Sequence, residues 1–209
     1  MNMIRKLSFI TTFLLISFIA NAQVEPLLLY KAQQDDKCRE WVEETMAKMT
    51  LKEKVGQLFI YTVAPQNNKA NLNLIRDAVQ THKVGGLLFS GGNLLTQAEL
   101  INLAHNYAEI PLMMPFDGEL GLAMRLKNTP SFPRNMILGC IQDDRLIYEY
   151  GKEVARELKE LGIHVKFAPV ADVNINPDNP VINTRSFGEG PKNVADKVLA
   201  YSSGLESGG

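Results

Sequence analysis

The sequence lacks several features that identify common classes of protein. Its 209 residues carry 22 basic and 23 acidic side chains, so the net charge is −1. A charge this close to zero gives no support for a nucleic acid or an acidic membrane surface as partner, and we expect neither. The glycine pairs Gly85-Gly86 and Gly91-Gly92 fit neither phosphate-loop nor dinucleotide-binding spacing. No serine stands in a G-x-S-x-G motif. The length and composition suit one globular domain with a sizeable core.

Cysteine and histidine are also scarce. The two cysteines, Cys38 and Cys140, could form a disulfide in an oxidising compartment, or both could be free and buried, and the sequence allows either. The three histidines, His82, His105 and His164, show no metal-ligand spacing. His164 begins a predicted strand, at the end away from the expected site. We therefore expect no metal site and no cofactor.

The N-terminus has the pattern of a secretory signal peptide over residues 1–22. Arg5 and Lys6 form a basic region, residues 7–19 are apolar, and Ala20-Asn21-Ala22 is a small-x-small cleavage site. An uncleaved membrane anchor is the alternative, but the apolar run is short against the roughly 20 residues that span a bilayer. We expect an exported protein, periplasmic or extracellular, with no stable membrane span after cleavage.

After the signal peptide, residues 23–36 are polar and irregular and predict a short linker. From residue 37 onward, amphipathic helices alternate with apolar strands. Helices are expected over residues 37–49, 71–81, 96–108, 144–161 and 194–205, and strands over residues 57–63, 84–90, 110–116 and 164–170. Thr50 and Glu53 predict a capping box, and Thr96 and Asp143 are expected helix caps.

Apolar strands that alternate with amphipathic helices indicate a parallel β/α architecture. Both a (β/α)8 barrel and a doubly wound sheet fit this alternation. A complete barrel takes about 250 residues, and only about four β/α units are visible in residues 37–209. If the fold is a barrel, the chain holds about its first half.

The strongest functional signal follows the third predicted strand. Asp117 ends that strand, Glu119, Gly121 and Arg125 lie in a glycine-containing loop, and Phe132-Pro133 closes the segment. Site residues of α/β enzymes often lie in such loops. A carboxylate can accept hydrogen bonds from two neighbouring sugar hydroxyls, and an arginine offers a planar fork of donors. The residue types alone also allow simpler roles: Asp117 capping its loop, Glu119 bracing it, and Arg125 on the surface.

Two further polar segments follow the fourth predicted strand. Asp172 lies within Ala168–Asn174, at the carboxyl end of the fourth predicted strand, and Arg185 lies in Asn183–Gly188, after a stretch rich in asparagine and proline. That composition fits an ordered loop over the mouth of a barrel. For Asp172, hydrogen bonding within its own loop is at least as good an interpretation as ligand contact. A solvated surface position is the alternative for Arg185.

These segments, with the prelude MTLKEKVGQL, resemble the catalytic domain of glycoside hydrolase family 3, especially its bacterial β-N-acetylglucosaminidases. The residues match the patterns D-x-E-G-G-x-x-x-R…F-P, A-P-V-x-D and N-x-R-S-F in order and spacing, although Leu120-Gly121-Leu122 departs from the usual Gly-Gly-Arg. The resemblance favours a (β/α)8 TIM barrel. It implies substrate-binding roles for Asp117, Arg125, Arg185, Glu119 and Asp172.

The resemblance also implies an activity, namely release of terminal non-reducing β-linked N-acetylhexosamine by a retaining mechanism, in glycan or peptidoglycan metabolism. The family's K-H-F-P-G-H-G loop, its Asp-His acid/base dyad and its aspartate nucleophile have no counterpart within residues 1–209. We therefore assign no catalytic residue, expect the chain by itself to be inactive, and expect its partners to be a carbohydrate substrate and the C-terminal half of its own barrel. A β-glucosidase of the same family and a non-catalytic sugar-binding barrel remain the alternatives.

Overall fold

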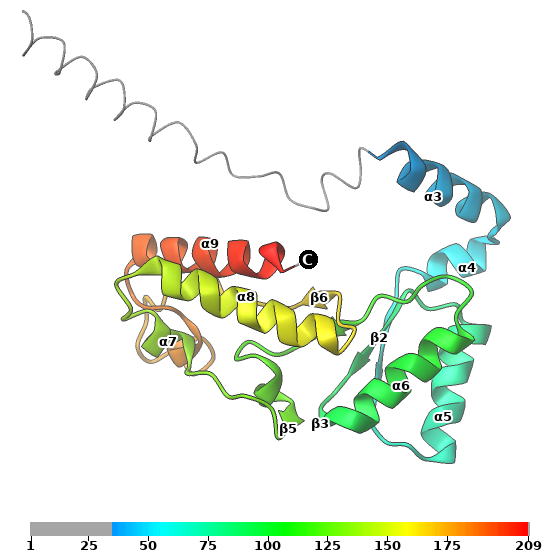
Figure 1. The fold of residues 1–209 in the computed structure, drawn as a ribbon, viewed down its shortest axis with the longest axis horizontal. Helices are drawn as coiled ribbons and strands as arrows, with labels where there is room; N and C mark the ends of the chain where they lie inside the picture. The colour runs from blue at the N-terminus through cyan, green and yellow to red at the C-terminus, as the bar shows by residue number, and fades with distance from the viewer. Residues whose placement is uncertain (1–34, 209) are drawn as a thin grey trace, which may run out of the picture. The chain divides into compact units, whose positions relative to one another are not determined.

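Four parallel strand segments, arranged in the order in which they occur in the chain, form the centre of the fold. A computed structural model describes residues 35–208 (Figure 1). The predicted signal peptide and nearly all of the predicted linker lie outside these described residues. The paired strands are β1 (Ile60–Val63) with β2 (Gly86–Phe89), and β4 (Pro115–Phe116) with β6 (Val165–Lys166).

A parallel bridge between Gly86 and Met113 connects the two pairs. The Leu87 N–H donates to the Met113 carbonyl at 3.1 Å, and the Met113 N–H donates to the Gly85 carbonyl at 2.8 Å. The order is therefore β1-β2-β4-β6, in which each strand lies beside the next one along the chain. Doubly wound sheets reverse their strand order at a switch point, whereas barrels keep it. The observed order is that of a barrel.

Helices follow each strand. They are α5 (Lys69–Arg76) with the π-turn Asp77–Thr81, α6 (Leu94–Tyr107), α8 (Asp144–Glu160) and α9 (Pro191–Ser207), preceded by α3 (Asp36–Lys48) and α4 (Leu51–Gly56). The main core lies between the sheet and α5, α6 and α8, and it contains fully buried side chains such as Ile75, Leu100, Met114 and Val154. A second buried cluster, which includes Phe187 and Tyr201, lies between α8, α9 and the loop before α9.

Helices α8 and α9 lie side by side at unusually close range (Figure 1). A Cβ atom added to Gly151 would lie 2.3 Å from the Tyr201 carbonyl oxygen, and one added to Gly204 would lie 2.1 Å from that of Tyr148. Real Cβ atoms do not approach backbone this closely, so glycine at both positions is what allows the two helices to touch. This contact holds α9 against α8.

Several of the predicted elements are confirmed. Asp143 caps α8, where its side chain accepts from the Arg145 N–H at 3.1 Å. Thr50 and Glu53 form the expected capping box. The predicted helix over residues 37–49 is α3, although no residue of α3 is buried.

Other predicted boundaries are wrong, each for a local reason. The first strand begins at Ile60 and not at residue 57, because the Gln57 N–H bonds back to Glu53 and continues the helical turn. Helix α6 begins at Leu94 because Asn93, and not Thr96, is its cap. The last strand ends at Lys166 and does not reach residue 170. Pro169, which follows shortly after, has no N–H to donate to a neighbouring strand.

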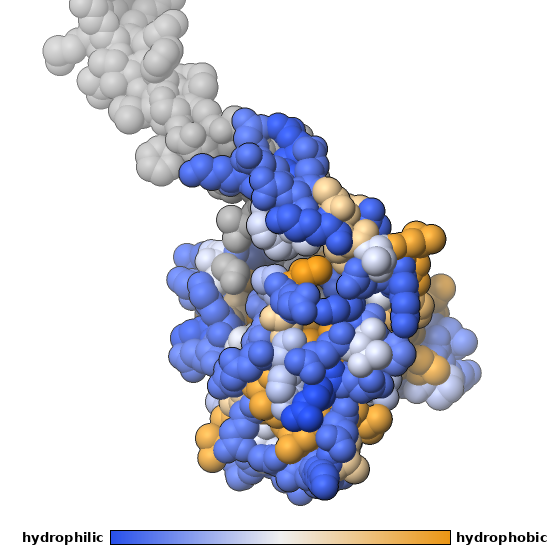
Figure 2. Space-filling model, turned by 90° about the vertical axis from the view of Figure 1, so that its right-hand side faces the viewer, coloured by the Kyte–Doolittle hydropathy of each residue, from blue (hydrophilic) through white to orange (hydrophobic). Residues whose placement is uncertain are grey.

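The described part of the chain leaves some apolar surface uncovered. Strand β1 has three exposed residues in a row, and Phe59, Ile60 and Tyr61 line an apolar groove of about 450 Å³ beside α5. Figure 2 shows that hydrophobic side chains also reach the surface among hydrophilic ones on the face it presents. Within residues 35–208, no helix has the length and apolar character needed to cross a bilayer.

Cys38 and Cys140 are both free and exposed. The burial that the sequence allowed for the two cysteines is not found.

Candidate functional site

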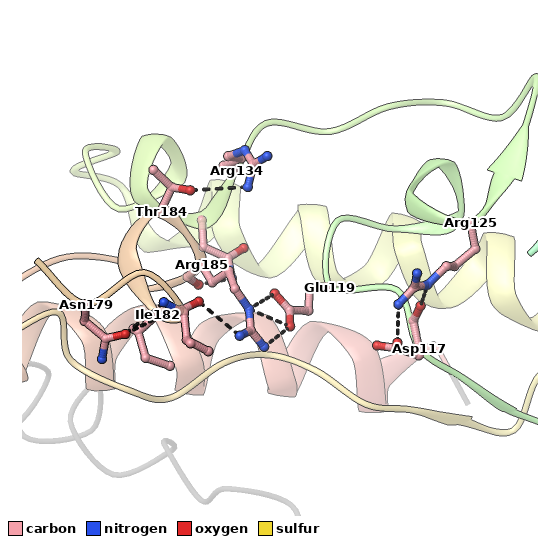
Figure 3. Close-up of polar contacts among 10 residues, drawn as sticks. Asp117, Glu119, Arg125, Arg134, Asn179, Ile182, Thr184 and Arg185 are labelled. Carbon is pink, nitrogen blue, oxygen red and sulfur yellow. Dashed lines mark hydrogen bonds and ion pairs between the residues drawn. The ribbon is translucent and has the colours of Figure 1, made fainter. Parts of the chain in front are cut away.

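Asp117 and Arg125 form the first of two acid–arginine pairs at the carboxyl end of the sheet (Figure 3). Asp117 directly follows β4, and the loop that begins there returns Arg125 toward it. The Arg125 Nε donates to the Asp117 backbone carbonyl at 2.8 Å, and its Nη2 donates to Asp117 Oδ2. Both side chains are partly exposed, so both present polar atoms to solvent. The pair is therefore accessible to a polar ligand.

The loop owes its path to a glycine and to a short parallel pairing. Gly121 has a φ of +82°, a conformation that side chains with a Cβ rarely adopt. Strand β3 (Gly92–Asn93) pairs with β5 (Leu126–Lys127), and the Gly92 N–H donates to the Arg125 carbonyl at 3.1 Å. The segment after β2 thus holds the end of the loop that starts after β4.

Glu119 and Arg185 form the second pair (Figure 3). The Arg185 Nε lies 3.0 Å from each carboxylate oxygen of Glu119, and Nη2 lies 2.5 Å from Oε1. Glu119 is only 8% exposed. Its hydrogen bonds and charge raise the pKa of Arg185 further. Because both Glu119 oxygens are engaged by Arg185, the geometry agrees with the bracing role that the sequence left open for Glu119.

Arg185 is also fixed through its backbone and its second terminal nitrogen. It lies in a single 3-10 turn, Asn183–Arg185, and its Nη1 donates to the Val181 carbonyl at 3.1 Å. The Nδ2 of Asn135, a residue only 2% exposed in the short helix α7 (Asn135–Leu138), donates to the Arg185 carbonyl at 2.7 Å. Sequence reasoning missed Asn135, because nothing in its neighbours distinguishes an amide that faces a distant loop.

Asp172 lies on the same end of the sheet. Its side chain is exposed, and its backbone carbonyl accepts from Ser186 Oγ at 2.6 Å, next to Arg185 in the chain. The charges of Asp117 and Asp172 both raise the pKa of Arg185, after the larger effect of Glu119. The structure therefore brings together all five residues that the sequence singled out.

The histidines lie elsewhere. His164 Nδ1 accepts from the Met114 N–H at 3.1 Å, and the His105 ring meets the His164 ring edge-on at 6.2 Å. Burial, and then the charge of His164, lower the pKa of His105. Both rings lie before the start of β4 or β6, at the end of the sheet away from Asp117. Over residues 35–208, no three His, Cys, Asp or Glu side chains are grouped in a way that could hold a metal ion.

The fold and the site together define a class of protein. Parallel strands in barrel order, with polar side chains on the loops at their carboxyl ends, are the arrangement of a (β/α)8 barrel domain. The family model described as "Glycosyl hydrolase family 3 N terminal domain" matches residues 50–209, and the chain belongs to this family.

Individual relatives agree with this assignment. The chain is 32% identical over 148 residues to beta-hexosaminidase A of Pseudoalteromonas piscicida. This alignment covers 65% of the chain and 25% of that protein. It is 28% identical over 178 residues to a beta-N-acetylglucosaminidase/beta-glucosidase of Cellulomonas fimi. This alignment covers 84% of the chain and 30% of the relative. The chain thus spans less than a third of either protein.

A solved structure also shares the fold. The family 3 β-N-acetylglucosaminidase of Paenibacillus sp. strain FPU-7 superposes with a TM-score of 0.67 at 32% sequence identity, over 77% of this chain and 31% of that one. The fold predicted from the sequence, part of a family 3 TIM barrel, is confirmed.

Proposed function

We propose that the intact protein containing this chain is a glycoside hydrolase that removes terminal non-reducing β-linked N-acetylhexosamine with retention of configuration. The observation that carries the proposal is the pair of acid–arginine contacts, Asp117–Arg125 and Glu119–Arg185, on the exposed carboxyl end of a family 3 barrel. The relatives named as hexosaminidases and acetylglucosaminidases support the substrate class.

In this proposal the polar groups of the site bind the sugar and do not break its bond. Asp117 has a second carboxylate oxygen that can accept a hydrogen bond from a sugar hydroxyl. Arg185 retains N–H donors beyond those that it donates to Glu119 and Val181. Arg125 and Asp172 complete the rim, and Glu119 orients Arg185. A retaining glycosidase needs two carboxyl groups about 5–5.5 Å apart across the scissile bond. Asp117 and Glu119 are each committed to an arginine, so we assign neither role to them.

The test uses the intact protein and two chromogenic substrates, 4-nitrophenyl β-N-acetylglucosaminide and 4-nitrophenyl β-glucoside. We expect kcat/KM to favour the acetamido sugar. The variants Asp117→Ala and Arg185→Ala should each lower kcat/KM roughly tenfold to a hundredfold, because each removes a charged hydrogen bond to the sugar. Glu149→Gln, an exposed change on α8, is the control. Wild-type turnover in both variants would contradict the proposed site.

The same assay separates the alternatives. The Cellulomonas fimi relative carries beta-glucosidase in its name, so a preference for the glucoside would identify that activity here. Saturable sugar binding without turnover would identify a non-catalytic sugar-binding barrel.

Export is part of the proposal and rests on the basic, apolar and small-x-small pattern of residues 1–22. Intact mass and N-terminal sequencing of the protein isolated from its host should show a chain that starts at Gln23. A soluble product that still carries Met1 would contradict it.

A further inference from the structure

A group of buried and half-buried ionisable side chains lies behind the sugar site, between α8, α9 and β6. Its members are Glu157 and Tyr150 on α8, Tyr201 on α9 and Lys166 on β6. The elements that carry them, α8 and α9, run behind the Asp117 and Glu119 loop in Figure 3. None of these residues contacts the positions to which a sugar is assigned, so the proposed function does not use them.

Glu157 is the unusual member of the group. It is 5% exposed, and neither of its carboxylate oxygens has a hydrogen-bond partner within residues 35–208. An ionised carboxylate without a partner is costly to bury, so such a group calls for an explanation. Burial raises the pKa of Glu157, and Glu153 and Glu160 add to the rise, while Arg156 and Lys166 oppose it.

Glu157 also lies beneath the loop between Glu119 and Arg125, which carries residues of the proposed sugar site. A Cβ atom on Gly121 would lie 3.9 Å from Glu157 Oε2 and 3.0 Å from the Phe132 ring. The Phe132 ring in turn packs on Tyr150 at 4.7 Å between centroids, and Tyr150 packs on Tyr201 at 4.9 Å. The loop between Glu119 and Arg125 therefore rests on this carboxylate and on a short stack of aromatic rings.

Lys166 provides the opposite charge. Its Nζ donates to the Tyr201 hydroxyl and lies 4.8 Å from the centre of that ring. Burial lowers the pKa of Lys166 to about 7, even though the charges of Glu157 and Glu119 act in the other direction. Lys166 is thus close enough to influence both the unpartnered carboxylate and the acid that holds Arg185.

We propose that Glu157 and Lys166 are positioning residues for sugar binding, and that the charge of Lys166 keeps Glu119 and the loop above Glu157 in the binding arrangement. The inference rests on the proposed function, because it concerns how that site is held. When Lys166 is charged, it balances the two carboxylates that face it. When it is neutral, Glu119 keeps Arg185 and Glu157 keeps Arg156 as the remaining counter-charge, and the loop is held less firmly.

The groups around Lys166 show which charge changes near pH 7. The charges of Glu157 on α8 and of Glu119 in the loop act on Lys166, Tyr201 on α9 accepts its hydrogen bond, and Tyr150 packs on Tyr201. Burial raises the pKa of Tyr150 to about 12, and burial first, with Tyr150 second, also raises the pKa of Tyr201, so both hydroxyls stay neutral near pH 7. The charge of Lys166, whose pKa is about 7, therefore changes in that range.

The experiment measures KM and kcat of the intact protein on the acetamido substrate from about pH 6 to about pH 8.5, the range in which a lysine with this pKa titrates. For the wild type, KM should rise about three- to tenfold across this range, the size of coupling that buried networks commonly transmit. Lys166→Met should show the high KM at all these pH values, and Lys166→Arg, which cannot lose its charge, should keep KM low and flat. In all three proteins kcat should keep one common pH profile.

Further variants test Glu157. Glu157→Gln keeps the shape of the side chain and removes its charge, and we expect a raised KM with kcat retained. Glu149→Gln and Lys152→Met, two exposed changes on the same helix, are the matched controls. A wild-type KM profile in both Lys166→Met and Glu157→Gln would overturn the inference.

A stability measurement, which does not depend on enzyme activity, separates this inference from the proposed function. A lysine whose pKa is lowered on folding binds fewer protons in the folded than in the unfolded protein, so stability rises with pH between about 7 and 10.5. Lys166→Met should lose that rise in the free energy of unfolding, and an unchanged rise would overturn the inference. If the wild type shows the rise but turns over no hexosaminide, the proposed function fails and the buried pair stands.

Discussion

Glu119 and Arg185, which lie 66 residues apart in the chain, hold each other in a two-pronged ion pair at the carboxyl end of the sheet. Glu119 comes from the loop after β4, and Arg185 comes from the loop after β6. The contact therefore joins two neighbouring β/α units across the top of the barrel. It also gives the arginine a fixed orientation, as the proposed sugar-binding role requires.

The first prediction concerns this pair. In Glu119→Gln, the glutamine amide can donate or accept hydrogen bonds but cannot offer Arg185 two ionised oxygens, so Arg185 should lose its fixed orientation. We expect KM for the acetamido substrate to rise about tenfold, with little change in kcat, because a charged hydrogen bond is worth about 1.5–3 kcal/mol and only part of it reaches the ligand. Michaelis–Menten kinetics on the intact protein would measure this.

The control for that prediction is the double variant Glu119→Gln/Arg185→Ala. If Glu119 acts only through Arg185, the double variant should be no worse than Arg185→Ala alone. Additive losses would show that Glu119 contacts the sugar itself.

The second prediction concerns the contact between α8 and α9. Gly204→Val would place a branched side chain against the Tyr148 carbonyl and force the helices apart. We expect a loss of stability above about 3 kcal/mol, or failure to fold, because the obstacle is backbone and cannot move aside. Urea unfolding of the intact protein would measure it, with Ser203→Ala, an exposed change one residue away, as the control. Wild-type stability in Gly204→Val would show that the helices are not in contact.

The third prediction concerns pH. Hydrogen bonds from the Arg145 side chain and backbone lower the pKa of Asp143 to about 2, from 3.8. A carboxyl group whose pKa falls on folding stabilises the protein above its unfolded pKa, and that contribution disappears as pH falls through the folded value. Stability from Asp143 should therefore be complete above about pH 4 and be lost toward pH 2. Asp143→Asn should flatten this part of the curve of unfolding free energy against pH, and an unchanged curve would contradict the assignment.

The sequence predicts the architecture well because the fold depends on periodicity. The helical spacing in α8 and its Asp143 cap appear directly in the chain, and so does the alternation of strands and helices. The boundaries depend on single hydrogen bonds instead. Asn93 caps α6 in place of Thr96 because its side chain reaches the Leu95 N–H at 2.9 Å, which no periodicity reveals.

The site residues also divide into those that the sequence reveals and those that only the structure reveals. Asp117, Arg125 and Arg185 are recognisable because residue type and spacing follow a family pattern. Asn135 and Glu157 are not, since their importance comes from what lies opposite them in space: the carbonyl of Arg185 in one case and the Gly121 turn in the other. Partners that are distant in sequence leave no local signal.

The fourth prediction concerns the 209-residue polypeptide expressed by itself. It should release no chromophore from 4-nitrophenyl β-N-acetylglucosaminide, because no nucleophile or acid/base is assigned within it. It should also self-associate. The β1 segment exposes Leu58, Phe59, Ile60 and Tyr61 in succession, and among residues 35–208 the outer edge of β1 has no paired strand. An open, apolar strand edge is a template for intermolecular pairing.

Size-exclusion chromatography at several concentrations would measure that association, with Phe59→Lys/Tyr61→Lys as the test of its cause. Charged side chains along an edge strand oppose pairing, so the double variant should move toward the monomer volume, whereas Leu199→Lys, at an exposed apolar position on α9, should not. If the unmodified polypeptide is monomeric, the β1 edge is not the exposed surface that the structure indicates. If it hydrolyses the substrate with a titrating carboxylate, then Asp117 or Glu119 is catalytic, and the separation of binding from catalysis proposed for this site is wrong.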